Sequence, residues 1–193
     1  MDEPAKRAAI VSVATLYEGW VKLLKLTIAK PDGGTMDREV EDHGAAAAVL
    51  PYDRERGTAI LVRQFRAPVL HSGGPPQILE VVAGLLDEDD PAACARREAE
   101  EEVGLRLGEV EPVATIWSSP GISTEQMHLF LAPYRAADRI GEGGGVADEN
   151  EDIEVVEMPL ADLWRLAESG AIRDLKTLAL VQALRLRHPD LFA

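Results

Sequence analysis

Three glutamates in the middle of the chain have the spacing of a cation site. Glu98, Glu101 and Glu102 stand at positions i, i+3 and i+4, so on an α-helix their carboxylates share one face. Like charges this close destabilise a helix unless a cation lies among them. Magnesium prefers oxygen ligands and is usually held by a few carboxylates together with substrate phosphates. The spacing therefore favours a magnesium–phosphate site, and the alternative is an acidic helix face in contact with solvent.

The residues on either side predict the helix that positions these glutamates. Asp90 is suited to cap a helix, and Pro91 suits the first helical position. Good or neutral helix formers follow, and Gly104 offers the left-handed conformation that ends a helix. We therefore expect a helix that begins at Pro91 and ends just before Gly104.

The same helix carries two arginines and the only cysteine of the chain. Arg97 lies one turn before Glu101 and can pair with it, and Arg96 can pair with Glu100 on another face. Cys94 lies on the alanine-rich side, which favours a buried structural thiol over a nucleophile. A single cysteine excludes an internal disulfide and is typical of a reducing cytoplasm.

The composition limits the class of protein. The 193 residues suffice for one domain with a sizeable core, and 46% hydrophobic with 28% charged residues are globular values. No stretch has the pattern of a signal peptide or a membrane span, so we expect a cytoplasmic protein. A net charge of −14 without a basic stripe argues against a nucleic-acid-binding surface. It is compatible with phosphate binding if divalent cations neutralise the site.

Apolar and alternating runs predict the other elements. An N-terminal meander of three strands within residues 1–42 is too small to bury a core alone, so it must pack on the main domain, residues 43–193, or on a second subunit. The strands are expected at residues 9–16, 20–29, 35–42, 45–51, 58–65, 78–84, 110–117, 126–132 and 153–158. Two further helices are expected at residues 160–169 and 176–187.

The glutamate helix resembles the core of the Nudix box. Residues 97–105, Arg-Glu-Ala-Glu-Glu-Glu-Val-Gly-Leu, match the pattern Arg-Glu-U-x-Glu-Glu-x-Gly-U, where U is aliphatic, and Gly84 supplies the opening glycine. Asp90 stands where the family usually has glutamate, and six residues instead of seven separate it from Arg97. The resemblance implies an α/β fold, the Nudix-type α/β/α sandwich on a mixed sheet. It also implies a pyrophosphatase that uses Mg²⁺ or Mn²⁺.

Segments outside the box resemble the GDP-mannose hydrolase branch of this family. They lie within residues 36–183 and include Val62-Arg-Gln-Phe-Arg66, Ala83-Gly-Leu-Leu-Asp87 and residues 151–155. The resemblance implies attack of water on the pyrophosphate of a nucleoside diphosphate sugar, giving a nucleoside monophosphate and a sugar phosphate. ADP-ribose hydrolases, which share fewer of these segments, give the alternative substrate. A second alternative is a binding module of this fold without catalysis, although such a module should have lost one of the metal carboxylates.

The resemblance also implies the metal ligands. Glu98 and Glu102 would hold magnesium, with the carbonyl of Ala83 as a further ligand. Glu101 would assist them, or would instead remain paired with the arginine one turn earlier. Glu151, in an acidic segment that follows a glycine-rich stretch, matches the late metal or catalytic position of the branch.

The base that activates water is expected outside the box, because carboxylates bound to metal are poor bases. Glu151 is the preferred base, ahead of Glu149 in the same acidic segment. Glu125, just after the Ser119-Pro-Gly turn, is the competitor. A glycine-rich connection can close over bound substrate as lids do, and the alternative is an acidic loop in solvent.

Substrate contacts are implied by the resemblance as well. Arg66 is suited to the diphosphate because a guanidinium binds phosphate oxygens in pairs, although it could also be a solvated strand end. Trp20 would stack on the base from the partner subunit, or would be a core residue. In this branch an N-terminal sheet builds the dimer, so a homodimer is expected. The other implied substrate contacts are Arg38, Glu39, Gly84, Leu85, Glu125, Asn150 and Lys176.

Overall fold

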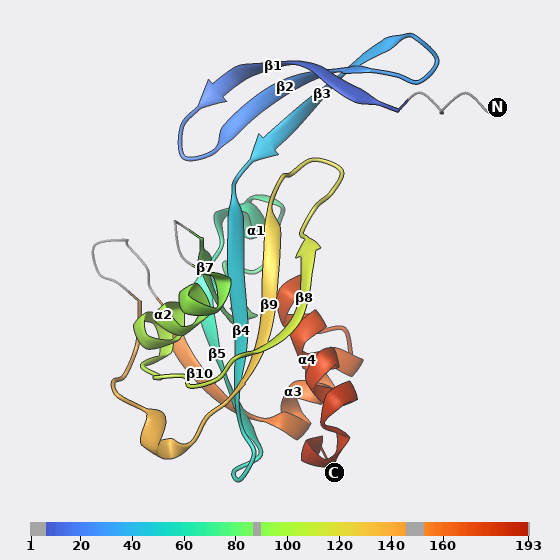
Figure 1. Cartoon of the computed structure of the whole chain (residues 1–193). Helices are drawn as coiled ribbons and strands as arrows, with labels where there is room; N and C mark the ends of the chain where they lie inside the picture. The colour runs from blue at the N-terminus through green and yellow to red at the C-terminus, as the bar shows by residue number, and fades with distance from the viewer. Residues whose placement is uncertain (1–6, 87–89, 146–152, 193) are drawn as a thin grey trace, which may run out of the picture. The chain divides into compact units, whose positions relative to one another are not determined.

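The computed structural model describes residues 7–86, 90–145 and 153–192 (Figure 1). The chain divides into two compact units. The first unit comprises Met1–Ala45 and Trp117–Gln126, and the second comprises Ala46–Ile116 and Met127–Ala193.

The first unit contains the N-terminal meander that the sequence predicts. Strands β1 (Ala9–Glu18), β2 (Lys22–Ala29) and β3 (Thr35–Asp42) form an antiparallel sheet in the order β1-β2-β3. The segment Trp117–Gln126 belongs to the same unit, since the N–H of Glu41 donates to the carbonyl of Ile122 at 2.8 Å.

The second unit is built on a seven-stranded mixed sheet in the order β10-β5-β4-β9-β8, with β6 on β5 and β7 on β4. Its strands are β4 (Ala45–Asp53), β5 (Thr58–Phe65), β6 (Gln77–Glu80), β7 (Val82–Leu85), β8 (Glu111–Trp117), β9 (Gln126–Pro133) and β10 (Glu154–Pro159). Its helices are α1 (Ala67–His71), α2 (Pro91–Val103), α3 (Leu160–Glu168) and α4 (Leu175–Arg187). None of the helices described is long and apolar enough to cross a membrane.

Alternate residues of the central strands fill a core on each face of this sheet. In β4, Leu50 belongs to the core that includes Leu180 of α4, while its neighbour Val49 belongs to the core that includes Ala99 of α2. Figure 1 shows α2 on one face of the sheet and α3 and α4 on the other. The predicted α/β/α sandwich is therefore confirmed.

The segment expected as one strand at residues 78–84 is two strands. β6 pairs antiparallel with β5, and β7 pairs antiparallel with β4. The break falls at Val81, whose N–H donates to the hydroxyl of Thr177 in α4 at 2.8 Å. This bend directs β7 toward α2, where the glutamates lie.

Candidate active site

Helix α2 begins and ends where the sequence predicts. The Asp90 carboxylate accepts hydrogen bonds from the N–H groups of Ala92 and Ala93, at 3.2 and 3.3 Å, and Pro91 is the first helical residue. Gly104 ends the helix with a φ of 63°, which is the left-handed conformation that glycine adopts without strain.

Two of the three aligned glutamates are buried against strand β7. The N–H of Ala83 donates to Oε2 of Glu102 at 3.3 Å. A Cβ at Gly84 would overlap the carboxylate of Glu98, so only glycine allows that carboxylate to come so close to the strand. Glu98 and Glu102, both buried, therefore approach the same stretch of backbone at Ala83 and Gly84.

Arg97 is the cation that lies among these carboxylates in the structure. Its Nη1 is 3.2 Å from Oε2 of Glu101, which is the pairing that the spacing predicts. The same atom is 2.7 Å from Oε1 of Glu98, a contact that the spacing did not predict. Burial alone would lower the pKa of Arg97, but Glu98, the Cys94 thiol and Glu101 raise it above its usual value. The guanidinium thus balances part of the negative charge on this face.

The predicted pair between Arg96 and Glu100 is wrong. Arg96 instead donates from Nε to the carbonyl of Gly108 at 2.8 Å. Glu100 is paired with Arg106, whose Nε lies 3.2 Å from Oε1. Arg106 follows the end of the helix, so this pairing depends on how the chain turns after Gly104 and not on helical spacing.

Cys94 is the buried thiol that the sequence predicts. Its Sγ donates to the carbonyl of Leu85 at 3.4 Å, and Nη2 of Arg97 lies 3.4 Å from the same oxygen. Burial raises the pKa of the thiol above its usual range, and Glu98 acts in the same direction. Cys94 and Arg97 therefore link α2 to the end of β7 through polar contacts.

The donors at this site suit a hard divalent cation. Glu98 and Glu102 offer oxygen on consecutive turns of one helix, beside the backbone of Ala83 and Gly84. Within the described ranges, no group of three or more His, Cys, Asp or Glu side chains is arranged to hold a metal ion. A cation here would therefore need further oxygen from the backbone, from water or substrate phosphates, or from outside those ranges.

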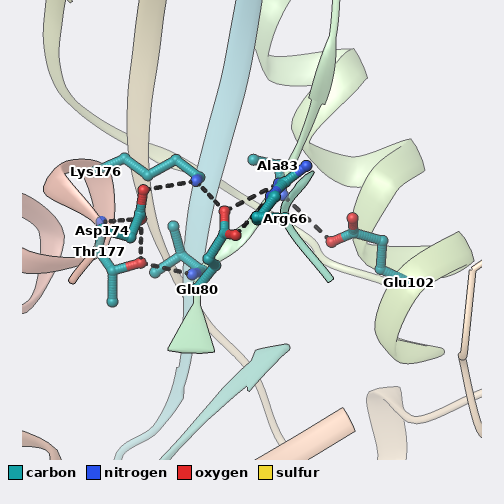
Figure 2. A network of polar contacts seen from close by, with 8 residues as sticks. Arg66, Glu80, Ala83, Glu102, Asp174, Lys176 and Thr177 are labelled. Carbon is teal, nitrogen blue, oxygen red and sulfur yellow. Dashed lines mark hydrogen bonds and ion pairs between the residues drawn. The ribbon is translucent and has the colours of Figure 1, made fainter. Parts of the chain in front are cut away.

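A second set of charged residues lies around the end of β6 (Figure 2). Glu80, at the end of β6, accepts from Nε and Nη2 of Arg66 at 2.7 and 3.0 Å and also from the ammonium of Lys176. Lys176 donates to Asp174 at 2.9 Å, and Asp174 caps α4 by accepting from the N–H of Thr177. Burial alone would raise the pKa of Glu80, but Arg66 and Lys176 hold it below its usual value.

Four predicted substrate or catalytic residues belong to the first unit. Trp20 is 84% exposed and lies edge-on to His43 with ring centres 4.9 Å apart, so the interpretation of Trp20 as a core residue is wrong. Arg38 and Glu39 are exposed on β3, where Nη1 of Arg38 donates to a neighbouring carbonyl. Glu125 is half-buried near the end of the Trp117–Gln126 segment.

Asn150, Glu149 and Glu151 lie outside the described residues. The glycine-rich stretch before them is described up to Gly145. The N–H groups of Gly144 and Gly145 donate to the carbonyls of Glu102 and Glu101, at 2.9 and 3.2 Å. Gly144 and Gly145 are therefore hydrogen-bonded to the last turn of α2, a contact that the run of glycines alone did not reveal.

Comparison with known proteins identifies the family. Residues 42–181 match the model of the NUDIX domain. A GDP-mannose pyrophosphatase of Cronobacter sakazakii is 45% identical over 177 residues, which are 89% of this chain and 92% of that protein. One from Klebsiella pneumoniae subsp. pneumoniae is 41% identical over 181 residues, 91% of this chain and 90% of that protein.

A solved structure has the same fold. It is the crystal structure of an ADP compounds hydrolase, with a TM-score of 0.77 and 19% sequence identity over 98% of both chains. The likeness at that identity concerns the fold alone. With the carboxylate helix in place and the family model covering most of the sequence, this chain belongs to the NUDIX domain family.

Proposed function

We propose that this protein hydrolyses the pyrophosphate of a nucleoside diphosphate sugar, with GDP-mannose as the first candidate and GMP and mannose 1-phosphate as products. The observation that carries the proposal is the pair of buried carboxylates, Glu98 and Glu102, that meet the β7 backbone at Ala83 and Gly84. The relatives that are 41% and 45% identical over most of their length are named GDP-mannose pyrophosphatases.

Metal binding is the first element of the proposal. Nudix hydrolases generally use divalent metals such as Mg²⁺. Glu98, Glu102 and the Ala83 carbonyl would hold Mg²⁺ or Mn²⁺, and Glu101 would assist if it leaves Arg97. Such an ion, when bound, would neutralise the negative charge that develops on the pyrophosphate oxygens. The net charge of −14 is then compatible with an anionic substrate and remains unfavourable for nucleic acid.

Glu151 is the proposed base that takes the proton from the attacking water. This role is implied by the family resemblance, which also makes Glu151 a possible late metal ligand. It is supported by the hydrogen bonds of Gly144 and Gly145 to the last turn of α2, shortly before the acidic segment. Glu125, in the first unit, remains the competing base.

Two cations of the second unit are proposed to bind the substrate. Arg66 would bind the diphosphate, because its side chain is partly exposed and its guanidinium can bind two phosphate oxygens. Lys176 uses two of its three N–H donors on Glu80 and Asp174, which leaves one for substrate. The remaining proposed contacts are Trp20, Arg38, Glu39, Gly84, Leu85, Glu125 and Asn150.

A homodimer is part of the proposal, with Trp20 and Arg38 reaching the substrate from the partner subunit. It is supported by β1, which is exposed at all ten positions. Exposed aliphatic and aromatic side chains on a strand without a covering layer are typical of an interface, and a second copy of the chain is the proposed cover. Its large exposed residues are Ile10, Val11, Val13, Leu16 and Tyr17. A buried free thiol, Cys94, supports a reducing cytoplasm as the place of action.

Product identification tests the proposed activity. The protein is incubated with GDP-mannose or ADP-ribose, with Mg²⁺ or with excess chelator, and both products are identified. We expect GMP and mannose 1-phosphate only when the metal is present. Cleavage of ADP-ribose alone would support the alternative substrate. Binding of GDP-mannose without cleavage would instead indicate a non-catalytic module.

A further inference from the structure

Glu80 is a buried carboxylate to which neither the metal site nor the proposed substrate contacts assign a role. Its side chain is 1% exposed, and it lies at the end of β6, between Lys176 and Arg66 (Figure 2). Both of those cations are proposed substrate contacts. Removing a carboxylate from water costs free energy unless cations and hydrogen bonds compensate for the lost hydration. Glu80 has two cationic donors.

The charges of this network cancel. Glu80 and Asp174 carry two negative charges, and Arg66 and Lys176 carry two positive ones. Asp174 is itself held in place as the cap of α4. The network therefore needs no bound anion to be neutral, and Glu80 is held ionised without substrate.

Arg66 is the member that solvent reaches. Its side chain is 40% exposed, whereas those of Lys176 and Asp174 are 9% and 15% exposed. Glu80 binds the edge formed by Nε and Nη2. A guanidinium has five N–H donors in a planar fork, so three remain on the other edges after these two bonds. The N–H groups that remain on Nη1 and Nη2 can donate to two phosphate oxygens at once.

The fork also lies in the field of the metal carboxylates. The pKa of Arg66 would be lowered by burial, but it is raised by Glu80 first and also by Glu102 and Asp174. Glu102 is the carboxylate that meets the β7 backbone at Ala83. Arg66 is therefore within electrostatic reach of the proposed metal ligands, which is where a diphosphate bound to the metal would lie.

We propose that Glu80 is a positioning residue for hydrolysis: it holds one edge of the Arg66 guanidinium so that another edge meets the substrate diphosphate. This inference rests on the proposed function. Lys176 and Asp174 complete the buried charge balance around Glu80. A different role for Glu80, stability of the fold alone, predicts no specific effect on substrate binding.

The first test replaces Glu80 by glutamine, which keeps the size and removes the charge. We measure kcat and KM for GDP-mannose with Mg²⁺, together with the thermal unfolding midpoint. A freed Arg66 should raise KM by about tenfold and change kcat much less, since binding energy common to substrate and transition state is lost. A wild-type KM in a folded Glu80→Gln protein would overturn the inference.

A matched control exists on β5, the strand that pairs with β6. Arg63 of β5 pairs with Glu154 at 3.0 Å, and the two side chains are 40% and 57% exposed. Glu154→Gln removes a carboxylate from an arginine in the same way, and KM should remain within about twofold of wild type. An equal rise of KM in Glu154→Gln would attribute the effect to overall charge and contradict a specific role of Glu80.

A double-mutant cycle tests whether Glu80 acts through Arg66. Arg66→Lys keeps the charge and loses the fork, so KM should rise by itself. In that background Glu80→Gln should add little further increase, because coupled residues are not additive. Full additivity of the two effects on KM would contradict the inference.

A further variant covers the case in which Glu80→Gln does not fold. Glu80→Asp keeps the charge and shortens the side chain, so the carboxylate withdraws from Arg66. The same rise in KM is expected, and a wild-type KM would overturn the inference. Failure of the wild-type protein to hydrolyse GDP-mannose would sink the proposed function, whereas hydrolysis with unchanged KM in the Glu80 variants would sink this inference alone.

Discussion

Strands β1 and β4 are both rich in aliphatic residues, and their surroundings are opposite. β1, in the first unit, is exposed at all ten positions, whereas β4, in the second unit, is buried at eight of nine. β4 has a helical layer on each face of its sheet, and both cores use its alternating side chains. An aliphatic run thus predicts a strand, but the cover over that strand depends on what the chain or a partner supplies.

The two units differ in whether they can be stable without a partner. The second unit has its own core and also holds the carboxylates of α2 that meet β7. Three strands without a covering layer bury too little to be stable alone, so the sheet of the first unit needs a cover. We therefore expect the chemistry to reside in the second unit and the residues of the first unit to depend on a second copy of the chain.

The largest expected effect tests which unit supplies the base. Glu151 belongs to the second unit, and its competitor Glu125 belongs to the first. Glu151→Gln should lower kcat by about 10²-fold or more with little change in KM, because a general base contributes on that scale. Glu149→Gln is the control and should do much less. A crippled Glu125→Gln beside a nearly silent Glu151→Gln would move the base to the first unit.

The next effect concerns the cover over β1. If a second copy buries Val13, Val13→Glu should weaken the dimer by about tenfold or more, because a buried valine is worth about 1.5–3 kcal/mol. Sedimentation at micromolar concentration should show a dimer for the wild type and a shift toward monomer for the variant. Ser12→Glu adds the same charge at the adjacent polar position and should have a smaller effect. A monomeric wild type would remove the homodimer from the account.

Local signals made helix α2 predictable. Asp90, Pro91 and Gly104 fix both of its ends through contacts within a few residues, and the sequence contains them in full. The α/β/α layers, in contrast, were implied by the resemblance of this helix to the Nudix box and not by the pattern of the strands. The helix, its carboxylate face and the fold class were therefore within reach of sequence analysis.

Long-range contacts decide what the sequence missed. The break at Val81 depends on Thr177, and the role of Glu80 depends on Lys176, each 96 residues away. A signal for Glu80 existed, because a lone carboxylate within the apolar run Ile78-Leu-Glu-Val-Val82 must find partners when buried. The identity of those partners follows only from the fold.

The acid stability of the second unit is expected to depend on Glu80. Its pKa in the folded protein is lowered from the ordinary value of 4.5. The stability that it contributes is therefore fully present above about pH 4.5 and is lost as the pH falls through the lower folded value. Urea unfolding measured between about pH 6 and pH 3 should have a shallower pH dependence in Glu80→Gln than in wild type. An unchanged slope would mean that the pKa of Glu80 is the same in the folded and unfolded states.

The smallest effect is expected at Cys94. Its buried thiol has a raised pKa, so iodoacetamide should modify it slowly in the folded protein and readily after unfolding. Cys94→Ala should leave kcat within about threefold of wild type, since inert buried cysteines act mainly through packing. Rapid modification with loss of activity would instead make Cys94 part of the reaction.

The most direct test compares two glutamates of α2. Glu102 is buried against β7, whereas Glu100 is exposed and paired with Arg106. With GDP-mannose and Mg²⁺, Glu102→Gln should fold normally and lose about 10²-fold or more in kcat, on the scale of one lost transition-state stabiliser. Glu100→Gln should keep its rate within about twofold. If Glu102→Gln hydrolyses its substrate at the wild-type rate, the metal site is not on α2.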